Sequence, residues 1–214
     1  MGNKLISEIG ALGMASKVLT EPTADDIRRA EKEFDRENEP IEWLLTELFE
    51  RFPANMDFGE VVLKTKVLNV LYSTQIRAVN VVARHILTLA VDSDLRAGKP
   101  EVVDRIARVQ LKGKTRSNFS FASKYCHWHQ PAAYPIYDGN VEACLWRYKN
   151  QGGIFGATLA ERGIVFRRYG YGYAEFVRIV NAFRDAYKLT SFTYKQLDKL
   201  LWSLGGRLLS VDKE

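Results

Sequence analysis

The chain contains little cysteine and little histidine. Cys126 and Cys144 are its two cysteines, so it can build neither a disulfide framework nor a four-cysteine iron–sulfur cluster by itself. A reducing compartment suits such a chain. His127 and His129 invite a metal interpretation, but residues two apart on a helix point away from each other. We therefore expect no metal and no other cofactor.

A long apolar run is also lacking. No stretch approaches the roughly 20 apolar residues that span a membrane, and the N-terminus has no clear secretion signal. The apolar content of 46% and the aromatic content of 12% are those of a chain that buries a core of its own. We expect a cytoplasmic, nucleoid-associated protein without membrane contact and without an obligate protein partner.

Strand patterns with a period of two are scarce, and apolar residues recur mostly at helical spacing. The pattern predicts an all-α chain of roughly ten helices and no sheet. Thr23 and Asp26 form a capping-box pattern, Pro40 is expected to separate two helices, and Gly205-Gly206 to end the last one. The expected helices cover residues 2–19, 24–38, 41–52, two within 58–90 that break near 73–77, 101–109, 119–129, one from 138 onward, 174–187 and 193–204.

Charge is distributed unevenly along the chain. Residues 21–60 hold thirteen acids and five bases, whereas residues 61–214 hold twenty-four bases and twelve acids. From Arg105 to Lys124 there are six basic residues and no acid. A short connection between two helices offers backbone N–H groups as well as such cations to a phosphate. The run therefore predicts binding to a nucleic-acid backbone, and a solvated basic loop is the alternative.

Three segments carry a family resemblance. Residues 135–141 read Pro-Ile-Tyr-Asp-Gly-Asn-Val, residues 72–75 read Tyr-Ser-Thr-Gln, and residues 197–205 form an apolar closing segment. In this order they resemble the helix-hairpin-helix DNA glycosylase superfamily, most of all its MutY-like and endonuclease III-like branch, although this chain lacks the four cysteines of that branch's iron–sulfur cluster. The resemblance covers residues 60–148 best.

This resemblance implies a two-lobed helical glycosylase fold. Residues 58–148 would form a six-helix barrel with the helix-hairpin-helix, and residues 1–57 with 149–214 a second lobe packed from both termini. Double-stranded DNA would lie in the groove between the lobes. A damaged, mismatched or modified base would be released after its nucleotide is flipped out of the duplex. Base excision repair and defence against phage DNA with modified bases are both open.

Asp138 has the central role that the resemblance implies. Cleavage of an N-glycosidic bond develops positive charge at C1′ of the sugar, so the site needs an ionised carboxylate close to that atom. The free N–H groups and the dipole at a helix N-terminus favour the charged form of an aspartate placed there. Alternatively, Asp138 only caps its helix.

Ser120 and two lysines compete for the second catalytic position. In the superfamily a lysine eighteen or nineteen residues before the aspartate forms a Schiff base, and hydrolytic members have serine there. Counting back eighteen residues from Asp138 gives Ser120, which predicts hydrolysis without strand cleavage. Lys124, one turn further on the same helix face, or Lys114 would instead make the protein a bifunctional glycosylase and lyase.

The remaining site residues are assigned by the same resemblance. Gln75 would fill the space left by the flipped nucleotide, and Ser73 and Arg77 would touch the DNA backbone beside it. Asn69 and Tyr72 would border the base pocket. The phosphate-binding segment would be Lys112, Gly113, Lys114, Thr115 and Arg116.

Two departures from the superfamily pattern bear on function. Residues 112–118 stand in place of the usual glycine-rich hairpin, and Val70 stands where the adenine-directed glutamate is expected. The identity of the excised base is therefore open. A non-catalytic helical DNA-binding module and an unrelated helical interaction protein are the alternatives to an enzyme.

Overall fold

The computed structural model describes residues 18–168 and 170–211, and this part of the chain is mostly helical, with one two-stranded sheet. The helix expected over residues 2–19 lies almost wholly outside the described residues. The elements are α2 (Ala24–Arg51), α3 (Phe58–Leu71), α4 (Val79–Leu89), α5 (Asp92–Arg96), α6 (Glu101–Ala107), β1 (Arg108–Leu111), β2 (Lys114–Ser117), α7 (Phe119–His129), α8 (Gly139–Asn150), α9 (Ile154–Glu161), α10 (Tyr173–Ala186) and α11 (Tyr194–Val211).

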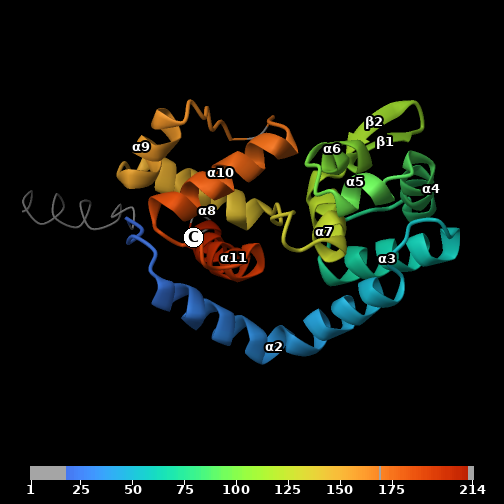
Figure 1. Ribbon diagram of the computed structural model, residues 1–214, viewed down its shortest axis with the longest axis horizontal. Helices are drawn as coiled ribbons and strands as arrows, with labels where there is room; N and C mark the ends of the chain where they lie inside the picture. The colour runs from blue at the N-terminus through green and yellow to red at the C-terminus, as the bar shows by residue number, and fades with distance from the viewer. Residues whose placement is uncertain (1–17, 169, 212–214) are drawn as a thin grey trace, which may run out of the picture.

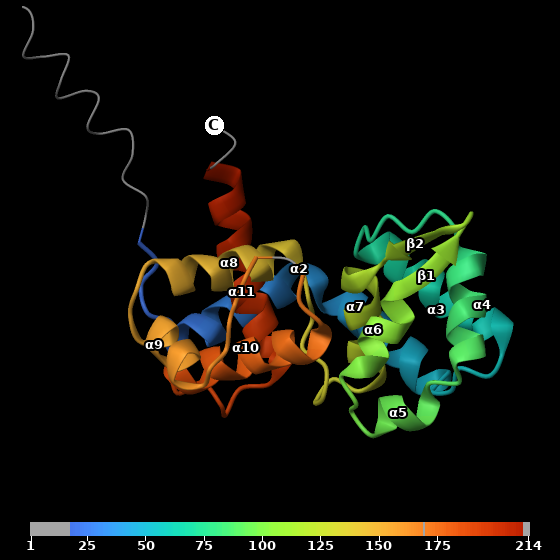
Figure 2. The same cartoon turned by 90° about the horizontal axis from the view of Figure 1, so that it is seen from above.

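The helices form two lobes side by side, with α3 to α7 in the first and α8 to α11 in the second (Figure 1, Figure 2). Helix α8 packs mainly on α11, and α6 packs on α7. The predicted lobe boundary at residue 148 is therefore wrong, because the chain crosses to the second lobe before α8 begins. Helix α2 packs mainly on α11, as expected for residues assigned to the second lobe, and it also contacts α7 and α3 of the first lobe.

Helix α2 begins where the sequence predicts it. The Asp26 N–H donates to the Thr23 hydroxyl at 3.2 Å, and the Thr23 N–H donates to the Asp26 carboxylate at 3.0 Å, so the capping box is confirmed. The predicted break at Pro40 is wrong, because α2 continues through it to Arg51. A proline inside a helix removes one hydrogen bond and bends the helix axis. Figure 1 shows α2 bent in its middle as it passes from one lobe to the other.

A β-hairpin joins α6 to α7, where the sequence predicts a helix-hairpin-helix. β1 pairs antiparallel with β2, and Lys112 and Gly113 form the turn between them with φ values of 51° and 73°. Positive φ at both central residues is the geometry of a tight two-residue hairpin, and glycine adopts it at little cost. The helix-hairpin-helix prediction is therefore wrong for this segment, as is the expectation of no sheet.

The two histidines of the sequence pair have different surroundings. His127 is buried, its Nδ1 lies 2.8 Å from the Tyr134 carbonyl oxygen, and burial lowers its pKa to about 3. The His129 Nε2 lies 3.4 Å from the Lys64 amine instead. Cys126 and Cys144 are both buried with free thiols. Among the described residues, no three histidine, cysteine or carboxylate side chains gather as metal ligands, and no helix is both long and apolar enough to cross a membrane.

Helix α11 crosses the start of α8 at a glycine. The prediction that Gly205-Gly206 ends the helix is wrong, because α11 continues to Val211. A Cβ atom at Gly205 would overlap the Asn140 carbonyl oxygen and lie 2.9 Å from the Asn140 Cα. This glycine is thus required for close packing between two helix backbones, and the crossing holds the N-terminus of α8 in place.

Replacing Gly205 by alanine tests this crossing. We expect Gly205→Ala to lower the free energy of unfolding by about 1–3 kcal/mol, because the backbones of α8 and α11 must separate. Gly206→Ala is the matched control, since its Cβ would lie 3.4 Å from the Asn140 Nδ2. It should be neutral or stabilising by up to about 1 kcal/mol through helix propensity. Urea unfolding of both variants makes the comparison, and equal stabilities would contradict it.

Candidate active site

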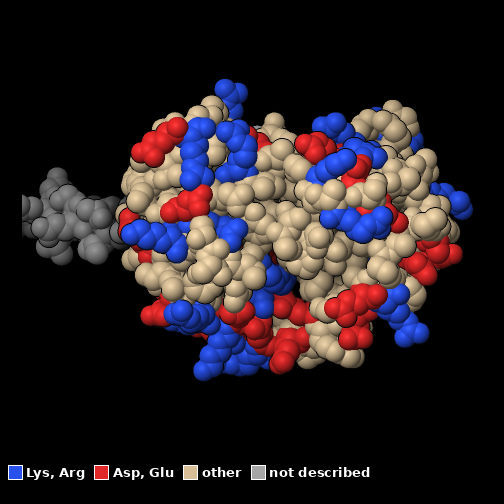
Figure 3. Space-filling model, viewed as in Figure 1, with Lys and Arg blue, Asp and Glu red and all other residues tan. Residues whose placement is uncertain are grey.

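A cavity of about 320 Å³ lies between the two lobes. Figure 3 shows the molecular surface hollowed between the lobes, with atoms of both basic and acidic residues beside the hollow. Its walls come from α2, the end of α3, α7, the segment before α8, and α11. The lining residues are Phe34, Asn38, Ile41, Glu42, Leu71, Tyr72, Ser73, Lys124, Ile136, Asp138, Lys195, Asp198 and Trp202.

Asp138 is the N-cap of α8, as the sequence predicts. Its backbone is extended, with φ −144° and ψ 151°, and its Oδ1 accepts a hydrogen bond from the Asn140 N–H at 3.0 Å. The side chain is 25% exposed and lines the cavity. Asp138 can therefore cap the helix and also face the cavity, because Oδ1 caps the helix and Oδ2 makes a different contact.

That second contact is an ion pair with Lys124. The Lys124 amine donates to Asp138 Oδ2 at 3.0 Å, to the Ser120 hydroxyl at 2.7 Å and to the Tyr137 carbonyl oxygen at 3.3 Å, and only 2% of the side chain is exposed. Lys124 reaches back one turn of α7 to Ser120, which is the direction helical side chains lean. The structure thus brings together Ser120, Lys124 and Asp138, with Lys124 in the middle and on the cavity wall.

Ser123 supports this arrangement and is not found by the sequence analysis. Its hydroxyl accepts a hydrogen bond from the Tyr137 N–H at 3.0 Å, and it lies 2.9 Å from the Ser120 carbonyl oxygen and 3.3 Å from the Tyr137 carbonyl oxygen. The extended residues before Asp138 are therefore attached to α7. The sequence gives one signal for the contact between Ser123 and Tyr137, which is that Ser123 lies three residues after the predicted Ser120 on the same helix.

The loop between α3 and α4 contributes Tyr72 and Ser73 to the cavity wall. Ser73 and Gln75 are exposed and have positive φ values of 49° and 58°, a conformation that costs energy for residues other than glycine. Ser73 lines the cavity, whereas Gln75 and the exposed Arg77 do not. The buried side chain of Ile76 anchors the loop between them.

Asn69 and Tyr72, both predicted at the base pocket, have different positions. The Asn69 amide donates to the Ile76 carbonyl oxygen at 3.0 Å and accepts from the Ile76 N–H at 2.8 Å, so it holds the loop and does not line the cavity. Tyr72 does line it, and the Trp128 indole N–H donates to the Tyr72 hydroxyl at 3.1 Å. The ring of Tyr72 lies 5.3 Å from the Lys124 amine.

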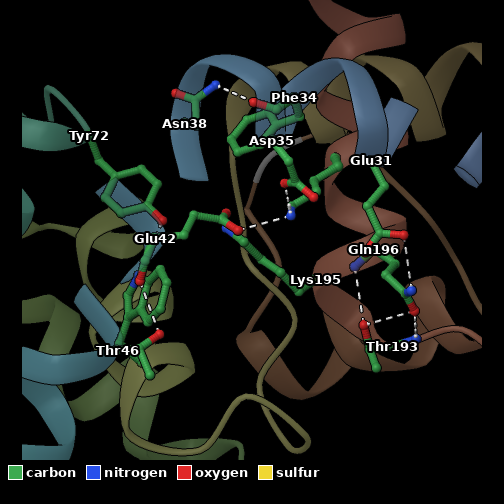
Figure 4. A network of polar contacts seen from close by, with 12 residues as sticks. Glu31, Phe34, Asp35, Asn38, Glu42, Thr46, Tyr72, Thr193, Lys195 and Gln196 are labelled. Carbon is green, nitrogen blue, oxygen red and sulfur yellow. Dashed lines mark hydrogen bonds and ion pairs between the residues drawn. The ribbon is translucent and has the colours of Figure 1, made fainter. Parts of the chain in front are cut away.

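An ion network joins α2 to α11 along the cavity wall, and Figure 4 shows it from close by. Lys195 pairs with Glu42 at 2.8 Å, and Lys199 pairs with Glu42 at 2.9 Å and also with Asp35. The network is charge-balanced and largely protected from solvent, so removing one partner would leave a buried charge. Sequence spacing shows that Lys195 and Lys199 share one helix face, as do Asp35 and Glu42, but it does not show that these two faces meet.

The basic segment 112–116 forms the exposed tip of the β-hairpin and lies outside the cavity. Lys114 is therefore not a group of the cavity, whereas Lys124 is. Lys112, Gly113, Lys114, Thr115 and Arg116 are all exposed. The Thr115 hydroxyl accepts a hydrogen bond from the Gln110 side-chain amide at 2.7 Å.

Comparison with known proteins places this two-lobed helical chain in a family. Residues 25–133 match the model of the HI_0787_N family, described as its N-terminal domain. A Haemophilus influenzae protein described as uncharacterized is 36% identical over 159 residues, which covers 73% of this chain and 72% of the relative. The chain therefore belongs to the HI_0787_N family. No solved structure matches it.

Proposed function

We propose that this protein is a DNA glycosylase that hydrolyses the N-glycosidic bond of a damaged, mismatched or modified base and leaves an abasic site. The observation that carries the proposal is the contact between Lys124 and Asp138 on the wall of the interlobe cavity. An ion pair between a buried amine and a partly exposed carboxylate is weak evidence for a role in stability alone. It suits a reaction in which a positive charge develops and must be stabilised.

Three features of the site fit this reaction. Asp138 presents an oxygen to the cavity, where the cation forming at C1′ of a flipped nucleotide would lie. The loop with Ser73 and Gln75 adjoins the cavity, so that one of its side chains could fill the space in the duplex. The hairpin with Lys112, Lys114 and Arg116 offers cations to the phosphates of double-stranded DNA. We place the protein in the cytoplasm, on the nucleoid.

Replacing Asp138 tests the reaction. We expect Asp138→Asn to slow single-turnover base release from duplexes carrying a panel of modified bases by at least about 100-fold, because the amide cannot stabilise the cation as a carboxylate does. Mass analysis of the released bases gives the readout. Asp185→Asn is the control, since Asp185 pairs with Arg162 away from the cavity. If the wild type binds DNA but releases no base, the protein is a non-catalytic DNA-binding module.

The position of Lys124 favours a second candidate, a bifunctional glycosylase and lyase. Its amine, after losing a proton, could attack C1′ as the base departs with the bonding electrons, and ring opening would give a Schiff base. Borohydride would then reduce the intermediate to a stable protein–DNA adduct. We expect an adduct with the wild type and none with Lys124→Ala if this candidate holds, while Lys114→Ala still forms it. Absence of an adduct during active base release would instead support hydrolysis.

Charge removal from the hairpin tests DNA binding. In Lys112→Ala/Lys114→Ala/Arg116→Ala, the slope of log affinity against log salt concentration should fall by about 0.9 for each phosphate that the hairpin no longer neutralises. The matched control removes three cations from the acidic helix α2, namely Arg28, Lys32 and Arg36. Fluorescence anisotropy of a labelled duplex measures both. Equal slopes for the two triple variants would refute a specific role of the hairpin.

A further inference from the structure

One carboxylate at the cavity has no direct partner among the described residues. Asp198 lies on α11 and lines the cavity, and its Oδ1 is buried without a hydrogen bond. The two cations of the cavity wall are engaged elsewhere, because Lys195 pairs with Glu42 and Lys124 pairs with Asp138. A buried acidic oxygen without a donor is costly when ionised and is favoured as the neutral acid.

The electrostatic surroundings of Asp198 also favour its neutral form. Burial raises its pKa to about 6, and the nearby charges of Lys195 and Lys124 oppose the rise, while Asp138 and Glu42 support it. A carboxyl group that titrates close to neutral pH is able both to give up and to take back a proton during a reaction.

The remaining cavity wall suits a flat heterocycle. Its volume of about 320 Å³ is at the small end of ligand pockets. Aromatic rings stack on the faces of nucleobases, and Phe34 and Trp202 meet edge to face at 6.0 Å on this wall. The apolar and aromatic lining residues are Phe34, Ile41, Leu71, Tyr72, Ile136 and Trp202.

We infer that Asp198 is the acid that protonates the departing base, and that the substrate base is therefore a neutral one, which needs a proton to leave. The inference rests on the proposed glycosylase function and names the leaving-group class. The N-glycosidic bond breaks, its electron pair stays on the base nitrogen, and the base takes the Asp198 proton. Water adds to C1′ as hydroxide, and the proton that it releases restores the acid through solvent.

The two carboxylates thereby have separate tasks. Asp138, held by Lys124 and by the Asn140 N–H, faces the sugar cation. Asp198, without a direct partner, faces the base. Two carboxylates whose surroundings favour different protonation states divide acid and charge-stabilising roles in this way. Lys195 and Trp202 share the helix face of Asp198, so α11 would form the base-facing wall.

Asp198→Asn tests the inference by a comparison of leaving groups. The variant keeps the shape of the side chain and loses its acidic proton. Release of the best neutral base of the panel should slow by at least about 100-fold. Release of N7-methylguanine should change by less than about threefold, because this base is already cationic in DNA and leaves as a neutral molecule without being protonated. Asp25→Asn is the control, because Asp25 is 81% exposed on α2. Equal losses for the two bases would show a merely structural role and overturn the inference.

The pH dependence of base release is a second measurement, and it would not change on substitution if Asp198 had only a structural role. Neutral-base release by the wild type should fall as pH rises through about 6, because the acid form of Asp198 is lost. Asp198→Asn should lose this fall. Other ionisable groups at the cavity remain in both proteins, and so their contributions cancel. They are Glu42, Tyr72, Lys124, Asp138 and Lys195.

Calorimetry of free purine bases binding to the protein distinguishes failure of the proposed enzymatic function from failure of the inference about Asp198. We expect the wild type to bind a base such as hypoxanthine more tightly at pH 5.5 than at pH 7.5, and Asp198→Asn to lose this difference. If the wild type shows the binding difference but releases no base from DNA, the proposed enzymatic function fails and Asp198 remains a base-recognising acid. If release and binding are both the same in the variant, Asp198 has no such role.

Discussion

An ammonium and a carboxylate meet where the two lobes touch, and the organisation of the cavity depends on that ion pair. Lys124 comes from α7 of the first lobe, and Asp138 comes from the start of α8 in the second. Replacing Asp138 by a neutral residue would leave the almost fully buried amine without its counter-ion, which costs several kcal/mol. Two further residues hold Asp138 in position for this ion pair. Ser123 binds the backbone of the segment before Asp138, and Gly205 allows α11 to pack closely against the start of α8.

Under the proposed function, the cavity and the surfaces around it would handle one nucleotide of a duplex. The strained loop after α3 adjoins the cavity, and Asn69 uses its whole amide to hold the loop in that conformation. The hairpin carries its cations farther out on the first lobe. The strained loop and the hairpin cations thus lie at the periphery, while Lys124 and Asp138 are held in fixed positions on a cavity wall that is otherwise largely apolar. Such preorganisation is what stabilisation of a transient charge requires.

Local sequence patterns predicted the elements with strong local signals. The capping box of Thr23, the break between α3 and α4, helix α7 and the N-cap role of Asp138 all follow from turn chemistry and helical periodicity. Patterns could not predict what depends on tertiary contacts. Pro40 stays inside a helix because α2 packs on both lobes, and Gly205 stays inside a helix because another backbone approaches it. The hairpin at 108–117 was not predicted because β2 is exposed along its whole length, and the alternation of exposed and buried residues in β1 covers only four residues.

The site residues also divide into those that local patterns predict and those that depend on tertiary contacts. Asp138 and Lys124 stood out through a motif and helical spacing, whereas Ser123, Glu42, Lys195 and Asp198 matter only through neighbours that are distant in sequence. Lys195 and Glu42, for example, are more than 150 residues apart and yet form one ion pair. No local pattern contains that information, because helix packing and not sequence distance decides which charges meet.

The course of α2 has a consequence for cooperativity. The family match covers residues 25–133, yet Ile27 and Ala30 in the first half of α2 are buried and this helix packs on α11, which lies outside that span. A fragment that ended at residue 133 would expose this apolar stripe to water. The matched segment is thus a unit of sequence similarity and not of folding, and the described chain should melt in one transition with both lobes losing structure together.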